Sequence, residues 1–206
     1  MDIVQSVALA GGMAWASGMR LYAVLFTAGL LGRLGYLQLP AALQVLENPW
    51  ILGTAGVMLT IEFLADKIPA VDSVWDGIQT FIRIPAGALL AALALGDHDP
   101  AWMLAAGLLG GTLTAGTHAA KAGGRALINT SPEPVSNIAA SLGEDVVAAS
   151  GLYAAFYHPA VFLILLGLFV ILLIWLLPKV IRGLRLVFGR FLVPRPGEAL
   201  RQRTPG

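Results

Sequence analysis

Cysteine is absent from the 206-residue chain, and charged residues make up only 12% of it. Without cysteine, the chain can form no disulfide framework, no thiolate metal site and no cysteine nucleophile. Ordinary soluble domains carry about 25% charged residues, so the low charge excludes a disordered chain, a coiled coil, a nucleic-acid-binding domain and most soluble enzymes. The sequence also contains no metalloprotease, nucleophile-elbow, phosphate-loop or dinucleotide-binding motif, and we expect no metal site and no cofactor.

Apolar residues dominate the chain instead, at 57%, and 24 residues are glycine. Glycine is more frequent in membrane helices than in soluble ones. Gly107 and Gly111 have the spacing of helices that cross closely in a membrane. This composition predicts an all-α fold, a polytopic membrane helix bundle.

A membrane-spanning helix needs about 20 apolar residues, and six segments approach or exceed that length. Arg20 interrupts the first segment, and the third is short unless residues 80–83 belong to it. The six predicted spans are 4–31, 49–65, 84–95, 101–117, 132–157 and 159–177.

The distribution of basic residues predicts the topology. Nearly all of them fall in segments that six alternating spans place on one side, whereas the opposite loops hold Glu47, Asp97 and Asp99. Because basic residues mark cytoplasmic loops, we predict both termini to be cytoplasmic, in the inner membrane of a bacterium. The chain begins without a basic segment, so we expect no cleaved signal peptide.

The chain is expected to divide into a transmembrane domain, residues 1–178, and a basic tail, residues 179–206. Basic residues recur in the tail near helical spacing among apolar ones. This pattern is typical of an amphipathic helix on the anionic inner leaflet. The tail either anchors the topology or binds a regulatory partner.

Residues 50–93 and 102–142 resemble each other, since each consists of an apolar helix, a polar connection and a second helix. This favours an internal duplication, which is parallel if both connections are cytoplasmic. The connections 68–82 and 118–131 are expected either to lie at the membrane interface or to re-enter the bilayer. Repeated, Pro- or Gly-interrupted helices commonly indicate a transport site at the repeat interface.

Ionisable residues inside the spans are the strongest functional signal, because each costs about 2.5–3.5 kcal/mol on insertion scales. We predict that a substrate- or ion-binding cluster contains Arg20, Glu62, Asp66, Arg83, Lys121, Arg125, Asn129, Asn137, Glu144 and Asp145. A secondary set comprises Lys67, Asp72, Asp76, His118, Ser131 and Glu133.

Helical spacing supports parts of this cluster. Glu62 and Asp66 are four residues apart and share a helix face. Arg20 should point into the bundle, since a lipid-facing arginine is costly. It is expected either to form a structural salt bridge with Glu62, Glu144 or Asp145, or to contact an anionic substrate.

Two further patterns lie near the second polar connection. His118, Lys121 and Arg125 form one basic helix face, which is either solvated or closely packed through the small residues around it. The polar residues at 133, 137, 141 and 144–145 form one stripe, which suggests a water-filled path or a proton relay.

Several segments together resemble the motifs of the bacterial membrane-protein family catalogued as domain of unknown function 4126. They are SGMRLY, EFLADKIPAVDSVWD, IRIPAGAL, THAAKAGGRALINTSPEPVSN and SLGEDV. The resemblance covers about residues 10–158 and implies a small multi-span membrane protein. It supplies no activity and no catalytic residue.

These residues favour a membrane transporter or a translocator of a small solute or anionic lipid headgroup, with carboxylates that couple movement to protons. A cation channel or divalent-cation carrier built from the carboxylates is the alternative. A lipid enzyme using Asp72, Asp76 or His118, and a structural or assembly protein, stay open. We expect as partners membrane lipids, an anionic ligand and a second copy of the chain, but no nucleic acid.

Overall fold

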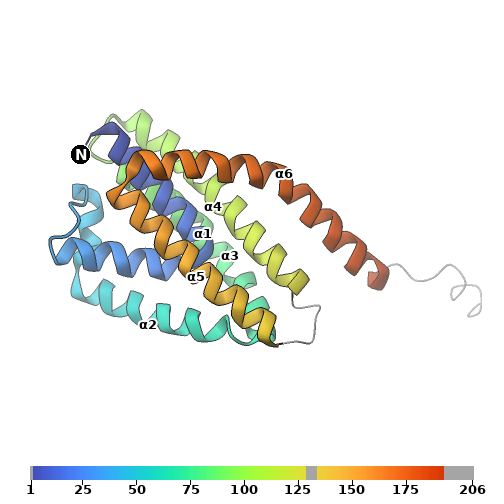
Figure 1. Cartoon of the computed structure of the whole chain (residues 1–206). Coiled ribbons are helices and arrows are strands. Elements are labelled where there is room, and N and C mark those ends of the chain that lie inside the picture. Colours follow the sequence, from blue (N-terminus) through green and yellow to red (C-terminus); the bar gives the residue numbers. More distant parts are fainter. Residues whose placement is uncertain (1, 129–133, 193–206) are drawn as a thin grey trace, which may run out of the picture.

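The computed structural model describes residues 2–128 and 134–192 (Figure 1). Within these ranges the chain forms six α-helices and one short 3-10 helix, and it contains no strand. The elements are α1 (Ile3–Arg33), η1 (Ala41–Glu47), α2 (Pro49–Ala65), α3 (Pro69–Ala94), α4 (Pro100–Ile128), α5 (Pro134–Tyr157) and α6 (Pro159–Leu192). The predicted all-α class is confirmed.

Proline begins every helix from α2 to α6. Its fixed φ suits the first turn, where the missing N–H has no intrahelical partner to lose. At the start of α2, the Asn48 side chain also accepts a hydrogen bond from the Trp50 N–H at 2.9 Å. At the start of α1, Asp2 and Gln5 form a reciprocal capping box. Local sequence therefore determines where most of the helices start.

Helix α1 is broken at Arg20, whose backbone φ of −143° and ψ of 75° lie outside the helical range. Figure 1 shows the two halves of α1 meeting at a sharp angle, with the second half turning back between α2 and α5. The first apolar segment is therefore a folded-back pair of half-helices, residues 3–19 and 21–33.

The first half of α1 runs alongside α4 and in the same direction. The Ala14 carbonyl accepts a hydrogen bond from Thr114 Oγ1 at 2.8 Å. Further along both helices, Gly18 lies against Thr117. The absence of a side chain at Gly18 allows this close approach.

The second half of α1 returns along α2 in the opposite direction. Phe26 lies against Gly56 near the middle of α2, whereas Gly29 lies against Leu52 near its start. The second half therefore ends where α2 begins, on the side of the bundle from which α1 started.

The bundle accordingly has two distinct ends. We call one of them the charged end, because most charged residues of the helices lie toward it. Helices α2, α4 and α6 finish there, α3 and α5 begin there, and Gly183 of α6 lies near Leu127 of α4. At the opposite end, His98 Nε2 in the α3–α4 connection lies 3.1 Å from Ser6 Oγ near the start of α1. The chain thus begins at the opposite end, whereas α6 finishes at the charged end. This arrangement and the predicted placement of both termini in the cytoplasm imply different topologies, and the membrane side that each end faces stays a prediction.

The two arrangements can be distinguished by single-cysteine labelling, since the chain has no cysteine of its own. We expect Asp2→Cys and Asp97→Cys to react with a membrane-impermeant maleimide from the same side of the membrane, and Arg182→Cys to react only from the other side. Labelling of positions 2 and 182 from the same side would contradict the folded-back path of α1.

Several of the predicted spans are shorter than the helices that contain them. By length and composition, three helical segments are long and apolar enough to cross a membrane: Ile3–Arg33, Ala70–Ala94 and Pro159–Gly183. The predicted connection 68–82 is not a separate interfacial or re-entrant segment, because residues 69–82 form the first part of α3. Likewise α4 continues through residues 118–128. Charged residues end the apolar runs in both places, but the helices continue because these charges are paired with other helices.

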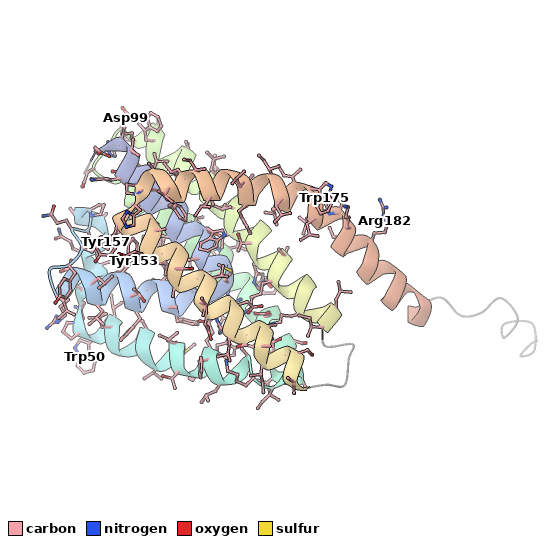
Figure 2. All side chains as sticks on the ribbon, viewed as in Figure 1. Trp50, Asp99, Tyr153, Tyr157, Trp175 and Arg182 are labelled. Carbon is pink, nitrogen blue, oxygen red and sulfur yellow. The ribbon has the colours of Figure 1, made fainter. Side chains whose placement is uncertain are left out.

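Helix α6 is the most apolar helix, with a mean hydropathy of 3.2 over its best segment. It runs without interruption through Pro178 to Leu192, so the predicted domain boundary at residue 178 lies inside a helix. Figure 2 shows Trp175 and Arg182 toward the charged end of the molecule, and Trp50 and Tyr157 at the opposite end. Such aromatic residues are enriched at membrane–water interfaces.

Helices α3 and α4 cross closely through small side chains. A Cβ on Gly87 would lie only 2.9 Å from the Cβ of Thr114. Gly107 and Gly111 face Ala88 in the same interface, which agrees with their predicted role in packing. Close approach of this kind replaces hydrophobic burial as a driving force between membrane helices.

We expect Gly87→Leu to lower the free energy of unfolding by about 1–3 kcal/mol, because a larger side chain forces α3 and α4 apart. Gly77→Leu, on the same helix, is the matched control, since no atom lies within 4 Å of the Cβ it would add. Reversible unfolding in mixed detergent micelles measures both. Because Gly→Leu raises helix propensity at both positions, equal losses in the two variants would show that close packing at Gly87 does not determine the effect.

The pair α2–α3 and the pair α4–α5 have the same orientation, since α2 and α4 both finish at the charged end and α3 and α5 both begin there. A parallel repeat requires this arrangement. The duplication of sequence itself stays a prediction.

Candidate functional site

Charged residues of the helices form one connected set of ion pairs, which we call the charged network. It lies at the charged end of the bundle and extends from there into the interior. Each member lies within 4.0 Å of a member of opposite charge. Its basic members are Arg20, Lys67, Arg83, Lys121 and Arg125, and its acidic members are Glu62, Asp66, Asp72, Asp76, Glu144 and Asp145.

Arg20 lies at the break in α1 and is buried. Its Nη1 pairs with Asp66 at the end of α2, and its Nη2 lies 2.8 Å from Asp145 Oδ1 on α5. Nη2 also donates to Ser141 Oγ at 3.2 Å. These contacts join the break to two other elements, so they orient the second half of α1. Of the three partners predicted for this arginine, the structure confirms Asp145 and adds Asp66.

Arg83 is fully buried in the middle of α3. Its Nη2 lies 2.5 Å from Glu62 Oε1, and its Nη1 donates to Asp76 Oδ1 at 2.9 Å. Nη1 also lies 3.2 Å from His118 Nδ1, while His118 Nε2 lies 2.7 Å from Thr80 Oγ1. Because arginine can only donate, this pattern fits a neutral His118 with its proton on Nε2.

Lys121 connects the two parts of the network. Its Nζ lies 3.3 Å from Asp76 Oδ1, 3.5 Å from Asp66 Oδ2 and 3.9 Å from Glu144 Oε2. It also donates to the Met19 carbonyl, beside the break in α1, at 3.3 Å. One ammonium group therefore contacts four separate elements of the bundle.

Arg125 holds the start of α5. Its Nη1 donates to Asn137 Oδ1 at 2.6 Å and to the Asn137 carbonyl at 2.7 Å. Its Nε donates to Glu144 Oε1 at 3.0 Å and lies 3.9 Å from Asp72 Oδ2. Asn137 in turn donates to the Asp66 carbonyl at 3.2 Å. The polar stripe of α5 thus faces the interior, as its spacing predicted.

Lys67 is the most accessible basic member, with a side chain 21% exposed. Its Nζ donates to Ser141 Oγ at 2.6 Å and lies 3.9 Å from Asp145 Oδ2. It also lies over the Phe63 ring. Partial burial lowers the pKa of the Lys67 ammonium below its usual value, and the Asp145 carboxylate offsets part of that shift.

The structure brings together nearly all of the residues predicted from the sequence. Of the primary set, Arg20, Glu62, Asp66, Arg83, Lys121, Arg125, Asn137, Glu144 and Asp145 lie in or against the charged network. Of the secondary set, Lys67, Asp72, Asp76 and His118 join it. The remaining candidates, Asn129, Ser131 and Glu133, lie outside the described residues.

The basic face of α4 is not solvated, because His118, Lys121 and Arg125 are each less than a tenth exposed. Two participants lie outside the predicted cluster. Ser141, which belongs to the predicted polar stripe, accepts hydrogen bonds from both Arg20 and Lys67, and the Thr80 hydroxyl joins His118 to α3. Serine and threonine are common in membrane helices, so neither residue is distinctive in the sequence.

No group of acidic or histidine side chains within the described ranges could hold a metal ion. Each carboxylate of the charged network instead lies within 4.0 Å of an arginine or lysine nitrogen. In this arrangement an external anion could replace a carboxylate beside an arginine or lysine. It is less suited to chelating a cation, because the carboxylates are already paired.

The fold and the site together define a helical membrane protein with a buried network of paired charges. A family model described as Domain of unknown function (DUF4126) matches residues 7–179, and the chain belongs to this family. The match includes every member of the charged network. No curated protein and no solved structure matches the chain.

Proposed function

We propose that this protein is a membrane transporter or translocator that moves a small anionic solute or the headgroup of an anionic lipid through the charged network. The break in α1 carries the proposal, because it places the buried Arg20 between carboxylates at the end of α2 and on α5. Interrupted helices that carry ionisable groups inside the bundle are a common construction of substrate sites in secondary transporters.

The near balance of charge suggests how an anion is accommodated. An incoming anion takes the place of a carboxylate beside Arg20 or Arg125. The displaced carboxylate then takes up a proton, because an unpaired charge inside the bundle is costly. Movement of the anion is thereby coupled to a proton.

Unpaired polar atoms argue against a purely structural network. Glu62 Oε2, Asp76 Oδ2 and Arg83 Nε are buried and have no hydrogen-bond partner among the described residues. Buried polar atoms of folded proteins are nearly always hydrogen-bonded, to protein or to water. These atoms therefore favour a network that admits water or a ligand.

We place the protein in the bacterial cytoplasmic membrane with the charged end facing the cytoplasm. Lys67 belongs to the charged network, and Lys179 lies over the ring of Trp175, which Figure 2 shows with Arg182 toward this end. Basic residues mark cytoplasmic segments. The first residues of the chain then face the other side.

Flux into liposomes that contain the purified protein tests the proposal. One assay follows radiolabelled phosphate, and the other follows the reduction of a fluorescent phosphatidylglycerol by external dithionite. We expect flux above that of protein-free liposomes in one of the two. Glu144→Gln should lower it about tenfold or more, because a charge-assisted hydrogen bond to Arg125 is worth about 1.5–3 kcal/mol.

Ser150→Ala is the matched control on the same helix, because Ser150 is exposed and bonds only the Val147 carbonyl of its own helix. It should retain full flux. The proposal is wrong if the wild-type protein gives no flux in either assay, or if a folded Glu144→Gln variant transports at the wild-type rate.

A further inference from the structure

Three apolar grooves of similar size lie on the sides of the described bundle, one of them among α1, α5 and α6. The other two differ in what they reach. The first, which we call the α1–α5 groove, has a volume of about 270 Å³ and lies between the second half of α1 and α5. Thr27, Leu31, Ala149, Leu152 and Phe156 are among the residues that line it. The second, of about 260 Å³, lies among α1, α3, α4 and α6, and it is lined only by apolar residues and glycine, among them Ala105 and Trp102.

Of these three grooves, the α1–α5 groove is the one that reaches the charged network, because Arg20 and Asp145 line its inner end. Arg20 is buried, and its Nε–H has no hydrogen-bond partner among the described residues. Lys67, 3.9 Å from Asp145, lies beside this end and remains partly exposed. The inner end therefore offers two hydrogen-bond donors of positive charge to a ligand.

We propose that the α1–α5 groove binds one acyl chain of an anionic phospholipid, with the lipid phosphate at Lys67 and Arg20. This inference rests on the proposed function, and it names the lipid as the substrate that enters the network. Free phosphate would need the donors but would leave the apolar groove without a role.

The dimensions of the groove fit this occupant. Asp145 and Tyr157 line its two ends on the same helix, which at 1.5 Å per residue are about 18 Å apart. One leaflet of the hydrocarbon core is about 15 Å thick. An acyl chain, which spans one leaflet, is therefore about as long as the groove.

The charge at this end also favours an anionic lipid. Lys179 and Arg182 are exposed where α6 reaches the charged end, and Lys179 lies over the Trp175 ring. Exposed basic groups beside a membrane attract anionic lipids at roughly 1 kcal/mol for each residue. Anionic lipids are therefore expected to accumulate at the charged end of the molecule, on the side of Lys67.

Photo-crosslinking tests the site. The full chain is placed in phosphatidylcholine nanodiscs that contain phosphatidylglycerol with a photoreactive acyl chain, and the adducts are mapped by mass spectrometry. We expect adducts on residues 27–31 and 149–156. Ala149→Phe, which fills the groove at an exposed position, should lower them about tenfold. Ala105→Phe makes the same change in the other groove and should leave them unchanged.

The headgroup contact is tested separately. Lys67→Gln should lower crosslinking about tenfold, since it removes a charge-assisted contact, whereas Lys67→Arg should preserve it. Equal crosslinking of a phosphatidylethanolamine or phosphatidylcholine probe would overturn the choice of an anionic lipid. Adducts spread evenly over all lipid-facing helices would overturn the site.

Binding and transport fail in different ways. Adducts in the groove without lipid flux would support the binding site and contradict the proposed function. Lipid flux that persists in Ala149→Phe would overturn the groove as the entry site and leave the proposed function intact.

Discussion

Arg83→Gln is expected to lower the free energy of unfolding by about 3–5 kcal/mol, because removing one partner of a buried ion pair leaves uncompensated charge. The arginine is fully buried between Glu62 and Asp76, which are also buried. Glutamine cannot neutralise either carboxylate. Reversible unfolding in mixed detergent micelles measures the loss.

Two comparisons separate the ion pair from general effects of the substitution. Arg33→Gln removes an exposed arginine that donates only to the Glu47 carbonyl, and it should change stability by less than about 0.5 kcal/mol. The double variant Glu62→Gln with Arg83→Gln should lose less than the two single variants together. Strictly additive losses would show that the pair contributes no coupling energy.

Most of the site residues could be predicted because charge is scarce in this sequence. An ionisable side chain inside an apolar segment needs a partner, so Arg20, Arg83 and Glu144 attract attention whatever the fold. The same reasoning could not choose the partners. Spacing along one helix shows which residues share a face, but it does not show how helices are rotated against each other. Asp66 was therefore missed as a partner of Arg20.

The lengths of α3 and α4 were underestimated for a related reason. Hydropathy treats Asp72, Asp76 and Lys121 as signals that a span has ended. In the structure these charges neutralise one another across helices, so the helices continue through them. A span boundary that depends on charge alone is therefore least reliable where the charges are paired across helices.

The path of α1 had no adequate signal in the sequence. Its 31 residues are apolar enough to cross a membrane, and no proline marks a break. The break at Arg20 depends on partners from the end of α2 and from α5, which are far away in sequence. The polar connections were expected to lie at the interface or to re-enter the bilayer, whereas the chain turns back within the first apolar segment. This turn places the start of α1 and the end of α6 at opposite ends of the bundle.

The same dependence on distant partners gives Lys121 its importance, since its ammonium group separates Asp66, Asp76 and Glu144. Lys121→Met keeps the length of the side chain and removes the charge.

We expect Lys121→Met to lower the free energy of unfolding by about 3–5 kcal/mol and to move α5 away from α3, because three carboxylates from different elements then repel one another. The cysteine-free chain allows spin labels at Phe81→Cys on α3 and Val146→Cys on α5, two exposed positions. The distance distribution between them should become longer and broader. Lys179→Met, on exposed α6, should leave it unchanged, and adding Glu144→Gln to Lys121→Met should partly restore it. An unchanged distance in a folded Lys121→Met variant would contradict a role for this lysine in holding α5 against the bundle.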